Sequence, residues 1–249
     1  MASRLLVLLC FSLLAAGPAA AAEPPLVADM SQDSISITSS FTGTEILLFG
    51  AIDRPGDVVV VVQGPREDLV VRRKARVSGI WMNRKSVTFH GVPAYYAVAS
   101  SRPLEDIAPP TVRARHRLGG DYLDFAIAGD THQLAGQELL DFREAILRNK
   151  AREDLFVIDE EQVRFRDHLF RTSLVFPANA PEGDYSVNVY LMRGGRVVDN
   201  QQSTLSIRKA GLERTIFDLA NEQPALYGLI AIVIALFAGW LAAVAFRRT

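Results

Sequence analysis

The densest group of side chains that could do chemistry is a run of bases in the first third of the chain. The run consists of Arg72, Arg73, Lys74 and Arg76, and Arg84 and Lys85 follow it. Several guanidinium groups held together can bind a phosphate or sulfonate oxygen, so the run predicts a contact for a small anion or a lipid headgroup. The alternative is a solvated strand edge, where bases discourage aggregation.

A second basic cluster follows the adjacent prolines at 109 and 110. It comprises Arg113, Arg115, His116 and Arg117. The same composition is typical of an exposed helical turn, so the cluster by itself predicts no ligand.

The other reactive residue types form no recognisable catalytic or metal-binding pattern. The histidines are His90, His116, His132 and His168, and none stands at metal-ligand spacing from another. Glu160 and Glu161 are typical of loop charge. The glycine-rich phosphate loops and nucleophile motifs of nucleotide-binding proteins and hydrolases are absent from the sequence. We therefore expect no catalytic residue, no metal, no cofactor and no enzymatic activity.

Charge also argues against a nucleic-acid partner. Once Arg4, Arg247 and Arg248 are set apart, the segment between the two apolar ends holds 28 acids and 24 bases, a net charge of −4. Proteins that bind nucleic acid generally carry a basic balance instead.

The elements that must position these residues read mainly as strands. Short β-branched segments bounded by Gly, Pro and Asp occur at 34–38, 45–50, 57–63, 68–77, 86–89 and 94–99, and again at 155–158, 163–165 and 169–176. Val58 to Val62 is a continuous apolar run, which predicts a strand covered on both faces. Residues 136–151 are the one clear helix of this part, because Leu139, Phe142 and Ile146 recur at helical spacing.

The segment from Pro181 to Met192 predicts the type of sheet packing. A Pro-x-Gly-x-Tyr run enters an alternating strand at Tyr185, as in immunoglobulin-like sandwiches, where the tyrosine pins a corner. Gly194 and Gly195 then predict a two-residue hairpin turn. The fold class is therefore mainly β, with immunoglobulin-like β-sandwich regions, a helical middle segment and one C-terminal transmembrane helix. The two β-regions could form two sandwiches or one larger sandwich interrupted by the helix.

The C-terminal apolar run predicts a membrane anchor. Residues 225–246 contain no charge, and about 20 apolar residues suffice for a helix to span a bilayer. Arg247 and Arg248 follow at once, and basic flanks remain cytoplasmic, so the predicted C-terminus is inside. Ala231, Ala235, Gly239 and Ala243 recur every four residues and could form a packing face for a second helix. Chance in an alanine-rich span explains the same spacing.

The N-terminus predicts a secretory signal peptide. Arg4 precedes an apolar core, and Ala20 to Ala22 offer small residues for cleavage, which would also remove Cys10. The predicted organisation is a signal peptide at 1–22, an N-terminal β-domain at 23–102, a helical connecting segment at 103–152, a C-terminal β-sandwich region at 153–210, a juxtamembrane linker or interfacial helix at 211–224, the transmembrane helix at 225–246 and a cytoplasmic tail at 247–249.

Long stretches of the chain resemble a family of alphaproteobacterial putative transmembrane proteins. They include FTGTEILLFGA, GDVVVVVQGP, VRRKARVSGIWMNR, LFRTSLVFPANAPEGDYSVNVYLMRGGRVV and QPALYGLIAIVIALFAGWLAAVAFRR. The resemblance implies a periplasmic domain with a single C-terminal helix in the inner membrane, and it implies no activity. It also points, through association only, to a membrane transporter as a partner.

Two functions remain as expectations. The first is a non-enzymatic accessory protein, whose exported domain binds an integral membrane protein and whose anchor packs against that partner or against a second copy. The alternative is a periplasmic module that binds a small anion or lipid headgroups through the basic run. In both, the lipid bilayer is a partner.

Overall fold

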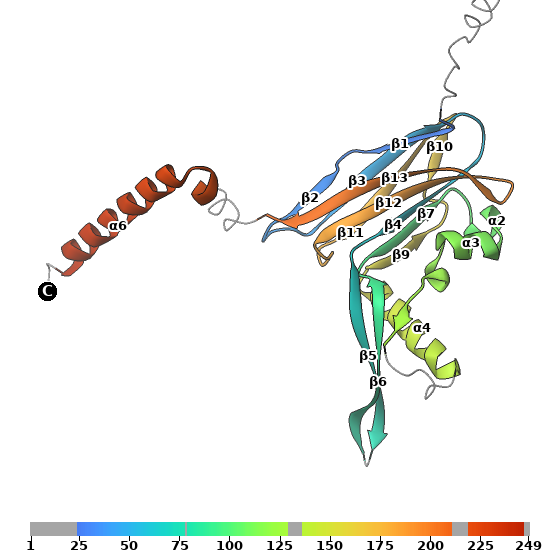
Figure 1. Ribbon diagram of the computed structural model, residues 1–249, viewed down its shortest axis with the longest axis horizontal. Coiled ribbons are helices and arrows are strands. Elements are labelled where there is room, and N and C mark those ends of the chain that lie inside the picture. The colour runs from blue at the N-terminus through green and yellow to red at the C-terminus, as the bar shows by residue number, and fades with distance from the viewer. Residues whose placement is uncertain (1–23, 78, 129–135, 211–218, 247–249) are drawn as a thin grey trace, which may run out of the picture.

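The computed structural model of the protein describes residues 24–77, 79–128, 136–210 and 219–246 (Figure 1). The strands are β1 (Leu26–Met30), β2 (Ser34–Ile37), β3 (Gly43–Ile52), β4 (Asp57–Gln63), β5 (Arg66–Val77), β6 (Ile80–Pro93), β7 (Tyr96–Ser100), β8 (Ala126–Ile127), β9 (Phe156–Asp159), β10 (Arg164–Arg166), β11 (Leu169–Pro177), β12 (Gly183–Arg193) and β13 (Arg196–Lys209). The helices are α2 (Leu104–Ile107), α3 (Pro110–His116), the 3-10 turn η1 (Gly120–Tyr122), α4 (Gly136–Arg152) and α6 (Pro224–Phe246).

The mainly β class predicted from the sequence is confirmed, together with the C-terminal apolar helix. The helix predicted at 136–151 is present as α4. The strands predicted at 86–89 and 94–99 are present as β6 and β7, and β6 is much longer than predicted, since it continues to Pro93 and pairs there with the start of β5. Several predicted features lie outside the described residues: the signal peptide at 1–22, residues 211–218 of the juxtamembrane segment, the tail at 247–249 and His132.

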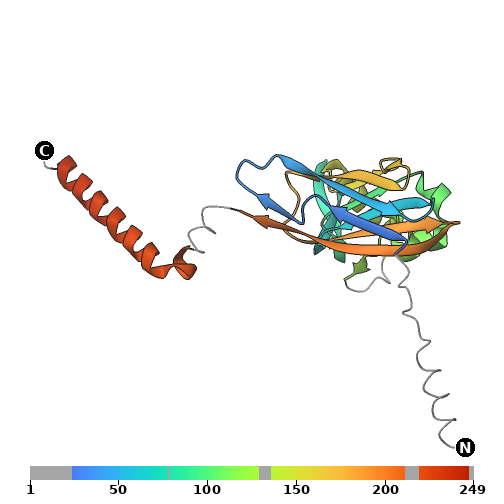
Figure 2. The same ribbon diagram turned by 90° about the horizontal axis from the view of Figure 1, so that it is seen from above.

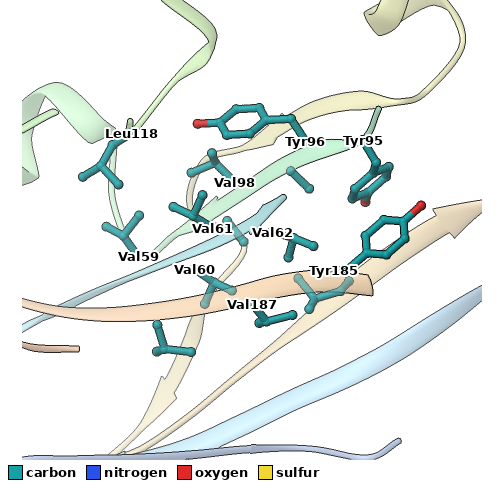
Figure 3. Packing of buried hydrophobic residues seen from close by; sticks show 14 of the residues in the cluster. Val59, Val60, Val61, Val62, Tyr95, Tyr96, Val98, Leu118, Tyr185 and Val187 are labelled. Carbon is teal, nitrogen blue, oxygen red and sulfur yellow. The ribbon is translucent and has the colours of Figure 1, made fainter. Parts of the chain in front are cut away.

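The largest sheet is organised around β4. Its strand order is β2-β13-β12-β4-β7-β9, with β2 parallel to β13, β9 parallel to β7 and the other pairs antiparallel. Val58 to Val62 are all at most 1% exposed, so the strand is covered on both faces, as its continuous apolar run predicts. Figure 3 shows Val59 and Val61 turned toward Leu118 and Val60 and Val62 turned toward Val187.

A second sheet lies face to face with the first and has the order β1-β3-β11-β10, all antiparallel (Figure 2). Strand β3 pairs with β11 along its length, from Gly43 opposite Pro177 to Ala51 opposite Leu169. In the first sheet β4 likewise pairs with β12. Strands from before and after the helical segment therefore share both sheets and a single hydrophobic core.

Aromatic side chains fill the space between the two sheets near one end. The Tyr95 ring stacks on Phe176 with 5.2 Å between ring centroids, and Tyr185 packs against both. The Tyr185 hydroxyl donates a hydrogen bond of 2.5 Å to the carbonyl oxygen of Pro181, which is the corner contact that the sequence predicts. Burial raises the pKa of Tyr95 and of Tyr185, so both hydroxyls remain protonated donors.

A third sheet, β5-β6-β8, leaves the main body as a two-stranded ribbon (Figure 1). Its base is held by α4, whose Lys150 ammonium is buried and lies 2.5 Å from Glu67 Oε1 on β5 and 3.3 Å from the carbonyl oxygen of Ala94. The register shifts between Arg73 and Lys74, where one extra residue of β6 forms a bulge. Among the described residues, no sheet or helix covers the half of the ribbon beyond this bulge, since residues 80–86 of β6 are all exposed.

The hairpin between β12 and β13 turns at Gly194 and Gly195, which both have positive φ, in agreement with the predicted two-residue turn. Strand β13 then runs for 14 residues through the largest sheet and ends at Lys209. Helix α6 contains the one stretch within the described residues that is long and apolar enough to cross a membrane, and none of it is buried against protein.

Candidate functional site

The outer face of the β1-β3-β11 sheet is apolar where a solvent-facing sheet would ordinarily be polar. On the inner face, Ile46 and Leu48 are buried in the core. The residues that alternate with them turn outward, and the large apolar ones among these remain exposed: Val27 53%, Leu47 41%, Phe49 43%, Leu169 60% and Val175 58%. We call this set the outer apolar face. Contiguous apolar surface of this kind typically marks an interaction site.

A groove lies across the outer apolar face and has a volume of about 660 Å³. Its floor comes from Val27, Phe49, Ala51 and Leu169. The register places Val27 and Leu169 on either side of Ala51, so three neighbouring strands contribute to one continuous floor.

Three arginines border this groove. They are Arg164 and Arg166 on β10 and Arg171 on β11. Arg164 stands directly opposite Arg171 in the strand register, an arrangement of like charges that destabilises a sheet. None of the three forms an ion pair with a residue that the structure describes. Asp29 also lines the groove, so its border carries three bases and one acid. The apolar floor and the net positive border suit a partner that offers apolar and acidic groups.

The basic run singled out in the sequence is divided between the two faces of the ribbon. Side chains alternate along a strand, so Arg72, Lys74 and Arg76 share one face of β5 while Arg73 turns to the other. Arg73 lies 3.8 Å from Glu138 and 3.7 Å from Asp141 of α4. The four bases therefore do not converge on one anion.

An acid of α4 also pairs with Lys85, one of the two bases that follow the run. Lys85, directly opposite Arg73 in the register, holds Glu138 at 2.7 Å. A second groove of about 400 Å³ lies between β5 and α4, and it is lined by charges of both signs: Arg72, Arg73, Lys74 and Arg148 with Asp141 and Glu144. A mixed lining of this kind favours α4 packing over anion binding.

The ribbon ends in apolar residues that sequence reasoning did not single out. Ile80 and Trp81 are each 67% exposed and Met82 is 53% exposed. Trp81 stands opposite Arg76, and Met82 stands opposite Ala75. The sequence does contain a signal for this tip. A short apolar segment lies between two groups of bases and joins the strands predicted at 68–77 and 86–89, so it must lie at the end of a hairpin.

The second basic cluster stabilises the helical segment. The Arg113 guanidinium lies 5.3 Å from the centre of the Tyr122 ring, and the His116 ring packs 5.2 Å from that of Tyr190. Partial burial, with a smaller contribution from the neighbouring Arg115, lowers the pKa of His116. Arg117 lies 3.6 Å from Asp124. These contacts point in different directions, so the cluster does not form one binding surface.

The backbone after α3 is fastened to the largest sheet. The Tyr96 hydroxyl donates a 2.5 Å hydrogen bond to the carbonyl oxygen of Arg117 and accepts one of 2.9 Å from the Gly119 amide. Leu118 between them is fully buried against β4 (Figure 3). This segment therefore covers the face of β4 that the second sheet leaves open.

The other titratable residues give no metal centre within the described ranges, where no group of three His, Cys, Asp or Glu side chains could hold an ion. His90 Nδ1 lies 2.8 Å from Asp68 Oδ2, and this hydrogen bond lowers the pKa of Asp68. His90 is thus paired at the base of the ribbon.

The proposed packing face of the anchor is compatible with the helical geometry of α6. Ala231, Ala235, Gly239 and Ala243 all lie within Pro224–Phe246 and recur at i, i+4, so they follow one side of the helix. A Cβ added at Gly239 would meet no heavy atom within 4 Å, which leaves this side free to approach a second helix.

Comparison with known protein families gives a match. A family model described as "Putative transmembrane protein (Alph_Pro_TM)" matches residues 25–248. No curated protein and no solved structure matches the chain.

Proposed function

The chain belongs to the Alph_Pro_TM family of putative transmembrane proteins, and on that premise we propose that it is a single-pass inner-membrane accessory protein. Its β-rich domain lies in the periplasm and its C-terminus in the cytoplasm. The domain acts by binding an integral membrane protein rather than by catalysis, and α6 holds it beside that partner.

The observation that carries this proposal is the outer apolar face with its groove. Five large apolar side chains are exposed on one sheet, and three arginines without ion-pair partners among the described residues border them. Removing this apolar surface from water favours binding by roughly 25 cal/mol per Å². The arginines add specificity for a partner that carries acidic groups beside its apolar ones.

The anchor supports the same proposal. A bilayer offers no hydrophobic driving force between helices, so small residues that permit close approach become the main means of packing. The face formed by Ala231, Ala235, Gly239 and Ala243 would let α6 lie against a helix of the partner. A second copy of the chain is the other occupant that this face would accept.

Site-specific photocrosslinking in native membranes tests the proposal. A photoreactive residue at Phe49 or Leu169 should give an adduct with a membrane protein. Gln202 and Thr204 are the matched control positions, because they are exposed on β13 of the opposite sheet and should give no adduct. Adducts at all four positions alike, or at none, would contradict the proposed binding face.

Substitution provides a second readout on the full-length protein. Leu169→Glu should remove the complex from a native gel of solubilised membranes, while Thr204→Glu should leave it intact, since both positions are exposed on strands. Gly239→Leu should weaken the complex through the anchor alone. Recovery of the unsubstituted protein as a free monomer would refute the accessory role.

Orientation is tested separately. Asn200→Cys and Thr249→Cys variants, each also carrying Cys10→Ser, would be labelled in intact spheroplasts with a maleimide that does not cross membranes. We expect labelling at Asn200 and none at Thr249 until the membrane is permeabilised. The reverse pattern would place the β-domain in the cytoplasm.

A further inference from the structure

The far end of the β5-β6 ribbon carries exposed apolar side chains that do not pack in the core of the protein. Beyond the bulge no strand or helix in the described part of the chain covers it, and the side chains of Ile80, Trp81 and Met82 near its end are exposed to water. An isolated two-stranded hairpin is at best marginally stable in water. We therefore expect the apolar end of this ribbon to be buried, either in a lipid bilayer or against a second molecule.

The charge of the ribbon identifies the kind of occupant. Residues 69–89 carry six basic and no acidic side chains. Arg73 and Lys85 are paired with α4, but Arg72, Lys74 and Arg84 make no hydrogen bond or ion pair with any described residue. The exposed end of the ribbon is thus both apolar and positively charged.

The strand register shows how far each base lies from the apolar end of the ribbon. Arg76 is directly opposite Trp81, and Lys74 and Arg72 follow on the same face. At a rise of about 3.3 Å per residue, they stand about 7 and about 13 Å behind Arg76. Trp81 and Arg76 therefore lie at the same distance from the end of the ribbon, and Lys74 and Arg72 lie further from that end.

We propose that Ile80, Trp81 and Met82 enter the headgroup region of an anionic lipid bilayer and that Arg76, Lys74 and Arg72 contact the lipid phosphates. Tryptophan favours this region because one side of its ring system is apolar and its N–H needs a polar partner. Each base near an anionic surface strengthens the contact about fivefold. The chain carries its own membrane anchor in α6, which keeps a bilayer within reach. This ribbon contact involves other strands than the outer apolar face and is independent of the accessory role.

The test uses the full-length protein in vesicles and the two tryptophans of the chain as reporters. A Trp240→Phe variant leaves Trp81 as the only tryptophan, and a Trp81→Phe variant leaves Trp240 in the anchor as a positive control. Each is reconstituted into vesicles containing lipids brominated on the acyl chains, which quench tryptophan only at short range. One set of vesicles contains phosphatidylglycerol, and the other contains phosphatidylcholine alone.

Trp81 should be quenched in the phosphatidylglycerol vesicles and much less in phosphatidylcholine, while Trp240 should be quenched in both. Lys74→Gln with Arg76→Gln should weaken the Trp81 contact about thirtyfold, because two bases are lost. The matched control, Arg152→Gln with Arg196→Gln, removes two exposed bases elsewhere and should leave quenching unchanged.

Two results would overturn the proposal. Trp81 that remains unquenched in both kinds of vesicle would show that the apolar end does not enter lipid, and a protein surface would then be its occupant. Quenching that is equal in both lipids would remove the role assigned to the bases. Circular dichroism of each variant verifies that the sheets are intact.

Discussion

Replacing Lys150 and replacing Glu67, which form an ion pair, should lower the free energy of unfolding by different amounts. The Lys150 side chain is 10% exposed, whereas that of Glu67 is 38% exposed. Glu67→Gln would leave the ammonium buried with a neutral amide and the carbonyl oxygen of Ala94, so it should cost about 3 kcal/mol, the lower end for breaking a buried pair. Lys150→Met keeps the apolar stem and leaves a carboxylate that water can reach, so it should cost only about 1 kcal/mol.

Urea unfolding of the detergent-solubilised full-length protein, followed by near-ultraviolet circular dichroism, measures both free energies. The ring signals of the core tyrosines report loss of the β-domain, while α6 remains in the micelle. The double variant Glu67→Gln with Lys150→Met should be more stable than Glu67→Gln alone, because it no longer contains a buried unpaired charge. Equal costs for the two single variants, or a larger cost for Lys150→Met, would refute the reasoning.

Three further predictions follow from single contacts. Gly50→Ala should cost about 1–3 kcal/mol in the same unfolding assay, because its Cβ would clash with the carbonyl oxygen of Val27 and would lie 2.5 Å from Cζ of Phe170. Tyr185→Phe should cost about 1 kcal/mol through loss of its corner hydrogen bond, and an unchanged free energy would show that the corner is dispensable. The hydrogen bond from Arg102 lowers the pKa of Asp57 below 3.8, so the stability it contributes is complete above that pH and is lost as pH falls through the folded-state pKa. Asp57→Asn should therefore flatten the acid limb of a pH–stability profile, and an unaltered limb would contradict this assignment.

The positions of most strands were predictable from the local pattern of apolar residues, but the pairing of one strand with another was not. Val58 to Val62 form a continuous apolar run, which predicts a doubly covered strand, and the core bears this out. The pairing of β3 with β11 joins segments on opposite sides of the helical region. No local pattern specifies which of several similar strands a given strand will meet, because each needs only an apolar face and a free edge.

The basic run illustrates a different limit. Residues adjacent in sequence were treated as one cluster, yet strand alternation sends Arg73 to the face opposite Arg72 and Lys74. That division follows from the predicted strand at 68–77 and could have been drawn from the sequence. The pairing of Arg73 with Glu138 and Asp141 could not, because it depends on where α4 packs.

The outer apolar face was missed although the sequence contains a signal for it. In the segment EILLFG, Leu47 and Phe49 are apolar as well as their neighbours Ile46 and Leu48. A strand with one face in water should alternate, so this segment requires a cover on its second face. The structure places no described element there, and the exposed groove is the result.

The way in which β13 leaves the domain has a mechanical consequence. Any pull transmitted from the anchor enters the β-domain at Lys209, the last residue of this strand. Strand β13 is bonded to β12 from Arg196 to Ile207, and over Ser206–Lys209, at the end where the pull enters, it is also bonded to β2. A force along the strand loads these hydrogen bonds in shear, so many must break together, whereas a terminal edge strand could peel away bond by bond. The domain is thus attached to its tether through a strand that has hydrogen-bonded neighbours on both sides at the point where tension enters.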